Sequence, residues 1–485
     1  MATTSPAITS LGVGSGLDLN SIVTKLVAVE RQPLTQMQAK ADTLQTQVSS
    51  FGQISSLFSA LQDASNALDD PTLWSKSTAT SSDGTAVSVT SASSAAAGNY
   101  AVTVQSLASS QTAASSTPYA ASTDIVGAGT LSIDIGSWNT AQNAFTAKTG
   151  TTTVSIDISA TDTLASVRDK INATGSGVTA SLVTDSTGVR LALSSTSTGV
   201  SNGFRITAAD ADGNNTDASG LSRVAFDPSS GAAGMQSVQA AADAAATVNG
   251  IAIASPSNTI TGAVDGLTIQ LQKVSSTPVN LSVASDTATV TKTVQSFVAA
   301  YNALSSYIAN QTKYDDVAKQ GGPLQGDSAA TGLQSQLRSL LGAESSASST
   351  FSRLSDMGLQ VQRDGTISVD QTKLTAATSN LSEMKKAFSA SDYSNPTNNG
   401  FARRFSTLAS QVLGVDGTVT THTASLQSLI TTNTADQAAV NARADTFQQR
   451  LIAQYTTLDS NLAQLNSISS YVTQQLALMS KSTTG

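Results

Sequence analysis

The sequence predicts an α+β multidomain protein in which helical coiled-coil termini and a helical bundle pack together, with a mostly antiparallel β-rich head inserted between them. Apolar residues recur at helical spacing towards both ends of the chain, whereas short alternating runs fill residues 73–285. The 485 residues suffice for three or four domains of ~100–200 residues each. Only 12% of the residues are charged, far below the usual ~25%, so we expect a polar but largely uncharged surface.

Residues 1–72 are expected to form an N-terminal helical arm. Asp18 or Asn20 can cap a short first helix, and Pro33 interrupts it because proline lacks a backbone N–H donor. A longer helix follows, and an Asp-Asp-Pro run at 69–71 ends it. Its apolar or small residues alternate steps of three and four, which predicts a heptad seam. The seam consists of Leu34, Met37, Ala41, Leu44, Val48, Phe51, Ser55 and Phe58.

Residues 73–285 lose the helical spacing, and we expect them to form the inserted head, divided into two subdomains. The expected strands are Ala86–Thr90, Asn99–Leu107, Thr130–Ile135, Thr153–Ile158, Val178–Thr184, Val189–Ser194, Leu267–Gln272 and Val279–Val283. Gly, Asn, Asp and Ser punctuate these runs, which favours antiparallel strands joined by turns.

One helix interrupts the strands of the head. Thr161 or Asp162 can cap it, and its apolar face includes Leu164 and Ile171. Together with the strand before it and the hairpin after it, this helix predicts a compact β-rich unit at about 150–200.

Residues 286–425 return to helical spacing and are expected to form a helical-bundle leg domain. Its first helix carries Val290, Val294, Phe297, Tyr301, Leu304 and Ile308 on one face. A second helix is expected to start near Asp327 or Ser328. The remaining expected elements are helices over Lys373–Phe388 and Phe401–Leu413 and a small β-hairpin at 358–370, which turns at Asp364-Gly365.

Residues 426–485 are expected to form a C-terminal coiled-coil arm that pairs with the N-terminal arm, because both carry heptad seams. From Leu451 the seam extends for about four heptads, or about 45 Å at 1.5 Å per residue. Its members are Leu451, Tyr455, Leu458, Leu462, Leu465, Ser469, Val472, Leu476 and Met479.

Charge is nearly absent from these arms. Tyrosines aside, Asp459 is the only ionisable side chain between Leu451 and Ser480. A solvated coiled coil normally carries Glu, Lys or Arg beside its seam, and Thr, Ser and Asn form helices poorly. We therefore expect arms that are marginal alone and become buried in an assembly. An ordinary intramolecular helical hairpin is the alternative.

Several classes of function lack support in the composition. The net charge of −8 offers no basic surface to nucleic acid or an anionic membrane, and no apolar run reaches the ~18 residues of a spanning helix. The chain has no cysteine and one histidine, which excludes thiolate and multi-histidine metal sites. No basic n-region of a cleavable signal peptide is visible. We expect no enzyme activity, no cofactor, no metal, no nucleic acid and no membrane partner.

Three local features resemble ligand-binding or catalytic motifs, but a structural role explains each of them better. Gly12-Val-Gly14-Ser-Gly16 lacks the Lys-Ser/Thr of a phosphate loop and predicts a flexible lead-in to a helix. Asp210–Asn214 has its glycine at loop position 4 rather than 6, and Leu221 stands where an EF-hand has Glu, so a surface turn is expected. His422 lies in a polar stretch that leads into a helix, and we expect it to be exposed or capping.

Several segments resemble the flagellar cap protein family, also called hook-associated protein 2. The matching segments are Gly14–Leu34 at the N-terminus, Gly322–Asp327 and Leu359–Asp370 in the C-terminal half, and Gln454–Val472 near the end. In addition, Thr163–Ala173 with Gly177–Val183 and Leu191–Ser194 is similar to a repeat found in flagellins and hook-associated proteins. The resemblance covers nearly the whole chain, except for about 73–150 and 200–260.

The resemblance implies a structural protein that caps the distal end of the bacterial flagellar filament, promotes flagellin polymerisation and prevents loss of exported flagellin. It implies export by the flagellar type III system without a cleaved signal peptide, and an extracellular place at the filament tip. The implied partners are further copies of the chain in a ring of four to six subunits, flagellin, the hook–filament junction proteins, and an export chaperone on the C-terminal helix. The implied partner-binding residues are Leu34, Met37, Leu44, Val48, Phe51, Phe58, Leu451, Tyr455, Leu458, Leu462, Leu465, Val472 and Leu476.

Two alternatives stay open at this point. Flagellin and other hook-associated filament components also pair helical ends around a β insert, although the short N-terminal arm and the Gly14–Leu34 motif favour the cap. A secreted adhesin that binds host mucin or glycan through residues 73–285 is the second alternative, and it is compatible with a position at the filament tip.

Overall fold

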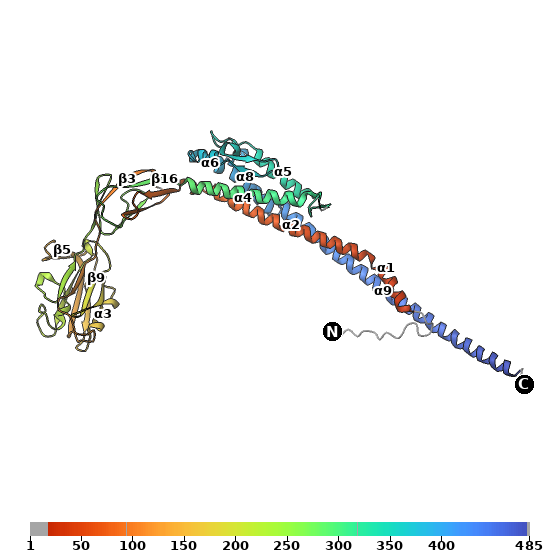
Figure 1. The fold of residues 1–485 in the computed structure, drawn as a ribbon, viewed down its shortest axis with the longest axis horizontal. Helices are drawn as coiled ribbons and strands as arrows, with labels where there is room; N and C mark the ends of the chain where they lie inside the picture. The colour runs from red at the N-terminus through yellow and green to blue at the C-terminus, as the bar shows by residue number, and fades with distance from the viewer. Residues whose placement is uncertain (1–17, 94, 318, 483–485) are drawn as a thin grey trace. The chain divides into compact units, whose positions relative to one another are not determined.

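The computed structural model describes residues 18–93, 95–317 and 319–482, with side chains described up to residue 479. The Gly12–Gly16 run and the first residues of the Gly14–Leu34 motif lie outside the described residues. The chain divides into two compact units, residues 1–74 with 287–485 and residues 75–286. The first unit is helical and the second is β-rich (Figure 1), which confirms the α+β class with an inserted head.

The helical unit is built around α2, which packs against α4, α8 and α9. Its helices are α1 (Leu19–Glu30), α2 (Gln32–Asp69), α4 (Thr287–Thr312), α5 (Ser328–Gly342), α6 (Gln371–Thr378), α7 (Leu381–Ser389), α8 (Phe401–Leu413) and α9 (Thr418–Ser482). Two small antiparallel pairs accompany them: β17 (Tyr314–Asp315) with β18 (Gln320–Gly321), and β19 (Leu359–Val361) with β20 (Ile367–Val369). One core joins α2 and α4 to α8 with the first half of α9, and Phe58, Phe297 and Phe405 are fully buried in it, whereas α1 lies outside this core.

Several helix ends follow the local chemistry of the sequence. The side chain of Asp18, rather than Asn20, caps α1 by accepting a hydrogen bond from the Ser21 amide at 3.0 Å. Pro33 lies in the first turn of α2, where its missing N–H costs nothing. Asp327 caps α5 by accepting hydrogen bonds from two amides.

Three boundaries differ from the sequence analysis. Residues 373–388 form two helices instead of one, because Asn380 leaves the helical conformation and caps α7. Thr163 caps α3 (Leu164–Ala173), while Asp162 accepts hydrogen bonds from Ser159 and Lys170 instead. The last helix begins at Thr418, upstream of the arm expected at 426–485, and continues without a break to Ser482.

The β-rich unit holds the inserted head. Its strands are β1 (Ser77–Ser81), β2 (Val87–Ser91), β3 (Gly98–Ser106), β4 (Thr112–Ser115), β5 (Gly129–Trp138), β6 (Phe145–Ala147), β7 (Val154–Ile158), β8 (Val178–Asp185), β9 (Gly188–Ser195), β10 (Gly203–Asp210), β11 (Met235–Gln239), β12 (Ala244–Val248), β13 (Ile251–Ser255), β14 (Thr259–Thr261), β15 (Leu267–Leu271) and β16 (Val279–Ser285). The strand pairs of the described head are antiparallel, as expected.

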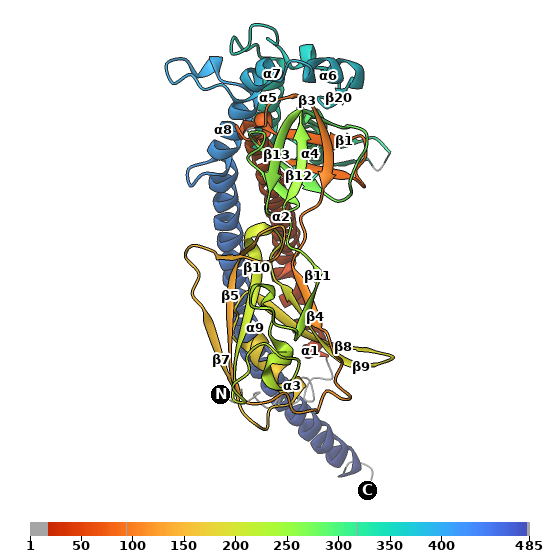
Figure 2. The ribbon, with the colours of Figure 1, turned by 90° about the vertical axis from the view of Figure 1, so that its left-hand side faces the viewer.

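The head contains two separate hydrophobic cores. One lies between a five-stranded sheet, ordered β1-β16-β3-β12-β13, and a three-stranded sheet, ordered β14-β15-β2. The other is enclosed by the sheet β11-β4-β9-β8, the sheet around β5, and α3. Figure 2 shows β1, β3, β12 and β13 side by side in the first of these sheets.

Candidate assembly surface

The short helix α1 lies against α9, far from it in sequence (Figure 1). Val23 and Val27 of α1 are buried against Ala444 and Leu451 of α9, and Phe447 and Tyr455 pack beside them. This contact is small, so the apolar burial that holds α1 in place is modest. Two of the predicted site residues, Leu451 and Tyr455, therefore contact α1 rather than the long seam of α2.

Two ion pairs lie at the end of this contact. Arg31 Nη2 is 2.6 Å from Asp445 Oδ1, and Arg443 Nε is 2.5 Å from Glu30 Oε1. The side chains are largely exposed, so each pair adds at most ~1 kcal/mol of stability. Their main effect is to fix the register of two helices that have few other charges.

The members of the predicted seam of α2 differ in how deeply they are buried. Phe51 and Phe58 are fully buried in the core, and Leu44 is buried in the same core. Val48 is partly buried against the same core, while Leu34 and Met37, near the start of α2, are half-buried. These side chains pack within the chain, and their partners include residues of α4, α8 and the first half of α9.

The C-terminal part of α9 continues beyond α1, as Figure 1 shows. From Tyr455 to the end of α9 this part is about 40 Å long. Its predicted site residues Leu458, Leu465, Val472 and Leu476 are 44–61% exposed, and Leu462 is half-buried. None of them belongs to a buried apolar cluster of the described chain. Burying one such leucine completely is worth roughly 1.5–3 kcal/mol, so this surface favours a partner.

Sequence reasoning missed part of this exposed apolar surface. Ile468, Tyr471 and Leu478 on α9 are also more than half exposed, although the heptad seam does not include them. On α1, the side chains of Ile22, Leu26 and Val29 are 37–60% exposed. The sequence of α1 does carry a signal for this exposed surface, because its apolar residues lie on more than one face of the helix. A search for a single heptad seam does not detect that pattern.

The helix α9 begins at Thr418, upstream of the arm expected from residue 426, and the sequence of its first half has weak apolar periodicity. Polar contacts help to hold it against α2 and α5. Buried Asn433 donates a hydrogen bond to the Met37 carbonyl at 2.8 Å. His422 Nε2 is 2.9 Å from Asp327 Oδ2, and the His422 ring packs 4.5 Å from the ring of Phe51. The expectation that His422 is exposed or capping was therefore wrong, because the ring is partly buried at a junction of three helices.

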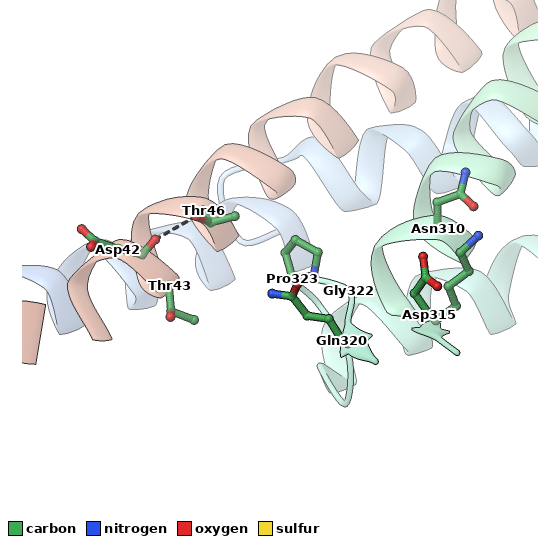
Figure 3. Close-up of a pocket in the computed structure, with 10 residues that line it drawn as sticks. Asp42, Thr43, Thr46, Asn310, Asp315, Gln320, Gly322 and Pro323 are labelled. Carbon is green, nitrogen blue, oxygen red and sulfur yellow. Dashed lines mark hydrogen bonds between the residues drawn. The ribbon is translucent and has the colours of Figure 1, made fainter. Parts of the chain in front are cut away.

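A polar hollow of about 650 Å³ opens between α2 and the end of α4 (Figure 3). Asp42, Thr43 and Thr46 line one side, and Asn310 and Lys313 lie on the other. These groups can donate and accept hydrogen bonds.

Among residues 18–93, 95–317 and 319–482, no three His, Cys, Asp or Glu side chains are grouped to hold a metal ion. In the same part of the chain, no helix has the length and hydropathy needed to cross a bilayer.

Sequence comparison identifies related proteins. Profiles of the flagellar hook-associated protein 2 N-terminus and C-terminus match residues 15–111 and 241–467, and a flagellin hook IN motif matches residues 144–197. The chain is 30% identical to the B-type flagellar hook-associated protein 2 of Pseudomonas aeruginosa, over 96% of this chain and 97% of that protein. It is 31% identical to the flagellar hook-associated protein 2 of Escherichia coli K12, over 97% and 98% respectively.

Comparison with solved structures points to the same family as the sequence comparison. The crystal structure of the D1-D2-D3 domains of the flagellar cap protein FliD from Escherichia coli matches with a TM-score of 0.60 and 29% identity, covering 78% of this chain and 99% of that one. A helical unit made from segments on both sides of a β-rich insert, together with a nearly uncharged, exposed apolar part of α9, defines a structural protein of an assembly. The chain belongs to the flagellar hook-associated protein 2 family, the family of the flagellar cap.

Proposed function

We propose that this chain caps the distal end of a bacterial flagellar filament, where it promotes flagellin polymerisation and prevents the loss of exported flagellin. The observation that carries the proposal is the exposed apolar part of α9 beyond Tyr455, in a chain that belongs to the cap family. A helix of this kind is unfavourable in water and becomes stable when a partner covers it.

The exposed members of the predicted site are the proposed contacts with flagellin and the hook–filament junction proteins: Leu458, Leu462, Leu465, Val472 and Leu476. The buried members act differently. Phe51 and Phe58 hold α2 against the helices of the leg, and Leu451 and Tyr455 seat α1 on α9. These contacts hold α1 and α2 in the packed helices from which the part of α9 beyond Tyr455 extends.

Copies of the chain are proposed to form a ring of four to six subunits at the filament tip. The same C-terminal helix is the proposed site of an export chaperone, which would cover its apolar side chains before assembly. Export through the flagellar type III channel needs a chain that unfolds easily. The exposed, nearly uncharged arm and the absence of cysteine suit that route.

The test is deletion of the gene in its own host, with an assay for unpolymerised flagellin in the medium and imaging of filaments. We expect bare hooks and free flagellin, both reversed by adding the purified protein. Normal filaments without leakage would refute the proposal. Imaging the purified protein separates it from a filament subunit, because a cap forms small closed rings and a flagellin-like protein forms long filaments.

A further inference from the structure

The strand β13 forms one edge of the five-stranded sheet of the head. We propose that β13 pairs antiparallel with β13 of a second copy of this chain, so that one sheet continues across the two heads. The proposal concerns contact between copies, and it does not depend on the capping role.

The outward backbone groups of β13 follow from its turn. Asn249 and Gly250 have φ values of 49° and 82° and connect β12 to β13 as a two-residue turn. In such a hairpin the residues that flank the turn form a hydrogen-bonded pair, so Ile251 and every second residue after it bond to β12. Ala252 and Ala254 therefore direct their N–H and C=O groups away from the sheet. Within the described residues, no hydrogen bond reaches these groups.

Four other edge strands of the head, β8, β10, β7 and β11, are protected. On β8, the Asn172 side chain donates to the Ala180 carbonyl at 2.9 Å and accepts from its amide at 2.7 Å. On β10, Ile206 pairs with Phe226 through two backbone hydrogen bonds. Lys170 Nζ donates to a carbonyl of β7, and a register shift interrupts β11. Such features are the usual means of preventing edge-to-edge pairing.

The edge of β13 has none of these features. Its five residues contain no charge and no proline, and its register with β12 is regular. Ala252 and Ala254 are exposed, and the side chain of Ile251 is 71% exposed. Pro256 follows directly and limits the available edge to the strand itself. An unprotected, regular and partly apolar edge is a template for an added strand.

Charge and register favour a second copy as the added strand. Residues 244–264 contain no acidic or basic side chain, although the chain as a whole carries a net charge of −8. Identical charged strands would place like charges close together, whereas this segment pairs with itself without repulsion. Antiparallel pairing centred on Ile253 places Ala252 opposite Ala254 of the second copy, and both residues then exchange their outward hydrogen bonds. Exposed Ile251 gains a diagonal contact with Ile253 of the second copy.

The contact is expected to be weak, because a five-residue strand buries far less than the ~1,200–2,000 Å² of a stable complex. Disulfide trapping suits a weak contact, and the chain has no cysteine of its own. In the proposed register Ile253 lies opposite itself at a Cα separation of ~4.5 Å, within the range that a disulfide spans. Full-length Ile253→Cys should form a disulfide-linked dimer under mild oxidation. The matched control is Ala263→Cys, an exposed position in the same uncharged segment but outside β13.

Two further variants make the test decisive. Ile253 is partly buried, so the double variant Ala252→Cys/Ala254→Cys repeats the test with exposed side chains that should meet across the two copies. Adding Ala254→Lys to Ile253→Cys should abolish the cross-linked dimer, whereas adding Ala263→Lys should not. Circular dichroism checks that each variant is folded. Cross-linking of the β13 variants no faster than Ala263→Cys, or insensitive to Ala254→Lys, would overturn the proposal.

Discussion

Arg31, on the connection between α1 and α2, donates a hydrogen bond to Asp445 of α9 across 2.6 Å. Its neighbour Glu30 accepts one from Arg443, two residues before Asp445. The adjacent pair Glu30 and Arg31 thus binds Arg443 and Asp445, each residue to one of opposite charge. Only one register of α1 along α9 satisfies both ion pairs. In helices with so few charges, these pairs determine where α1 lies more than they determine how strongly it binds.

Reversing one of these charges should loosen α1 locally. For Asp445→Arg we expect a loss of ~0.2–1 kcal/mol and faster hydrogen exchange in Leu19–Glu30, because the side chains are largely exposed. The double variant Arg31→Asp/Asp445→Arg should restore protection, and a double-mutant cycle measures the coupling. The control is Asp436→Arg, at an exposed position on the same helix. If Asp436→Arg had the same effect as Asp445→Arg, or if the double variant did not restore protection, this role would be contradicted.

Buried and exposed members of the predicted seams should respond differently to truncation. Phe58→Ala removes a side chain with no solvent exposure and should cost roughly 3–5 kcal/mol of the helical unit's unfolding free energy. Leu465→Ala removes a side chain that is 60% exposed and should change that free energy by less than ~0.5 kcal/mol. Urea unfolding followed by circular dichroism measures both. Comparable losses would mean that the C-terminal part of α9 is packed within the monomer.

Much of the fold was predictable because local chemistry determines it. The Asp364-Gly365 turn between β19 and β20, the cap at Asp327 and the end of α2 at Asp69 lie where the residues indicate. The boundary at Asn380 was missed because the apolar spacing continues across it while the side chain favours a cap. Residues 418–425 were left outside the expected arm because tertiary contacts, such as that between His422 and Asp327, stabilise a helix of weak propensity.

The candidate site was less predictable than the fold. A heptad pattern gives the same signal for Phe51, which is buried within the chain, and for Leu465, which is exposed. Which one remains exposed depends on where the other elements end. The helix α1 begins at Leu19 and the α9 contacts end near Tyr455, and neither limit is a property of the seam itself.

Acidification should loosen the loop that precedes η5 (Leu354–Met357). The hydrogen bond from Lys386, together with that from Ser348, lowers the pKa of Glu383 to about 2 from an ordinary value of 4.5. A lowered pKa stabilises the folded state above pH 4.5, and this contribution is lost as the pH falls from 4.5 towards 2. The protection factors of the amides at residues 345–351, which correct hydrogen exchange for its intrinsic dependence on pH, should therefore fall across that range.

Glu383→Gln should remove most of this pH dependence and leave the loop less protected at neutral pH. The substitution keeps the shape of the side chain but removes the charge that Lys386 and the loop hydrogen bonds stabilise. Asp416→Asn, at an exposed acid on the connection between α8 and α9, serves as the control. An unchanged pH profile in Glu383→Gln would show that another group controls the loop.

The most direct prediction concerns the exposed part of α9. Replacing Leu458 and Leu462 by Asp places two negative charges on a surface that we propose is buried against flagellin, where an unpaired charge costs several kcal/mol. The double variant should remain folded, because neither side chain belongs to a buried core of the described chain. It should nevertheless fail to restore filaments to a deletion strain, with free flagellin in the medium. The control, Ser460→Asp/Gln464→Asp, adds the same charge to exposed polar positions of the same helix turns and should still support filaments. Normal filaments with the leucine variant would remove α9 from the capping contact, whereas failure of both variants would show that charge on this helix, rather than its apolar stripe, is what assembly rejects.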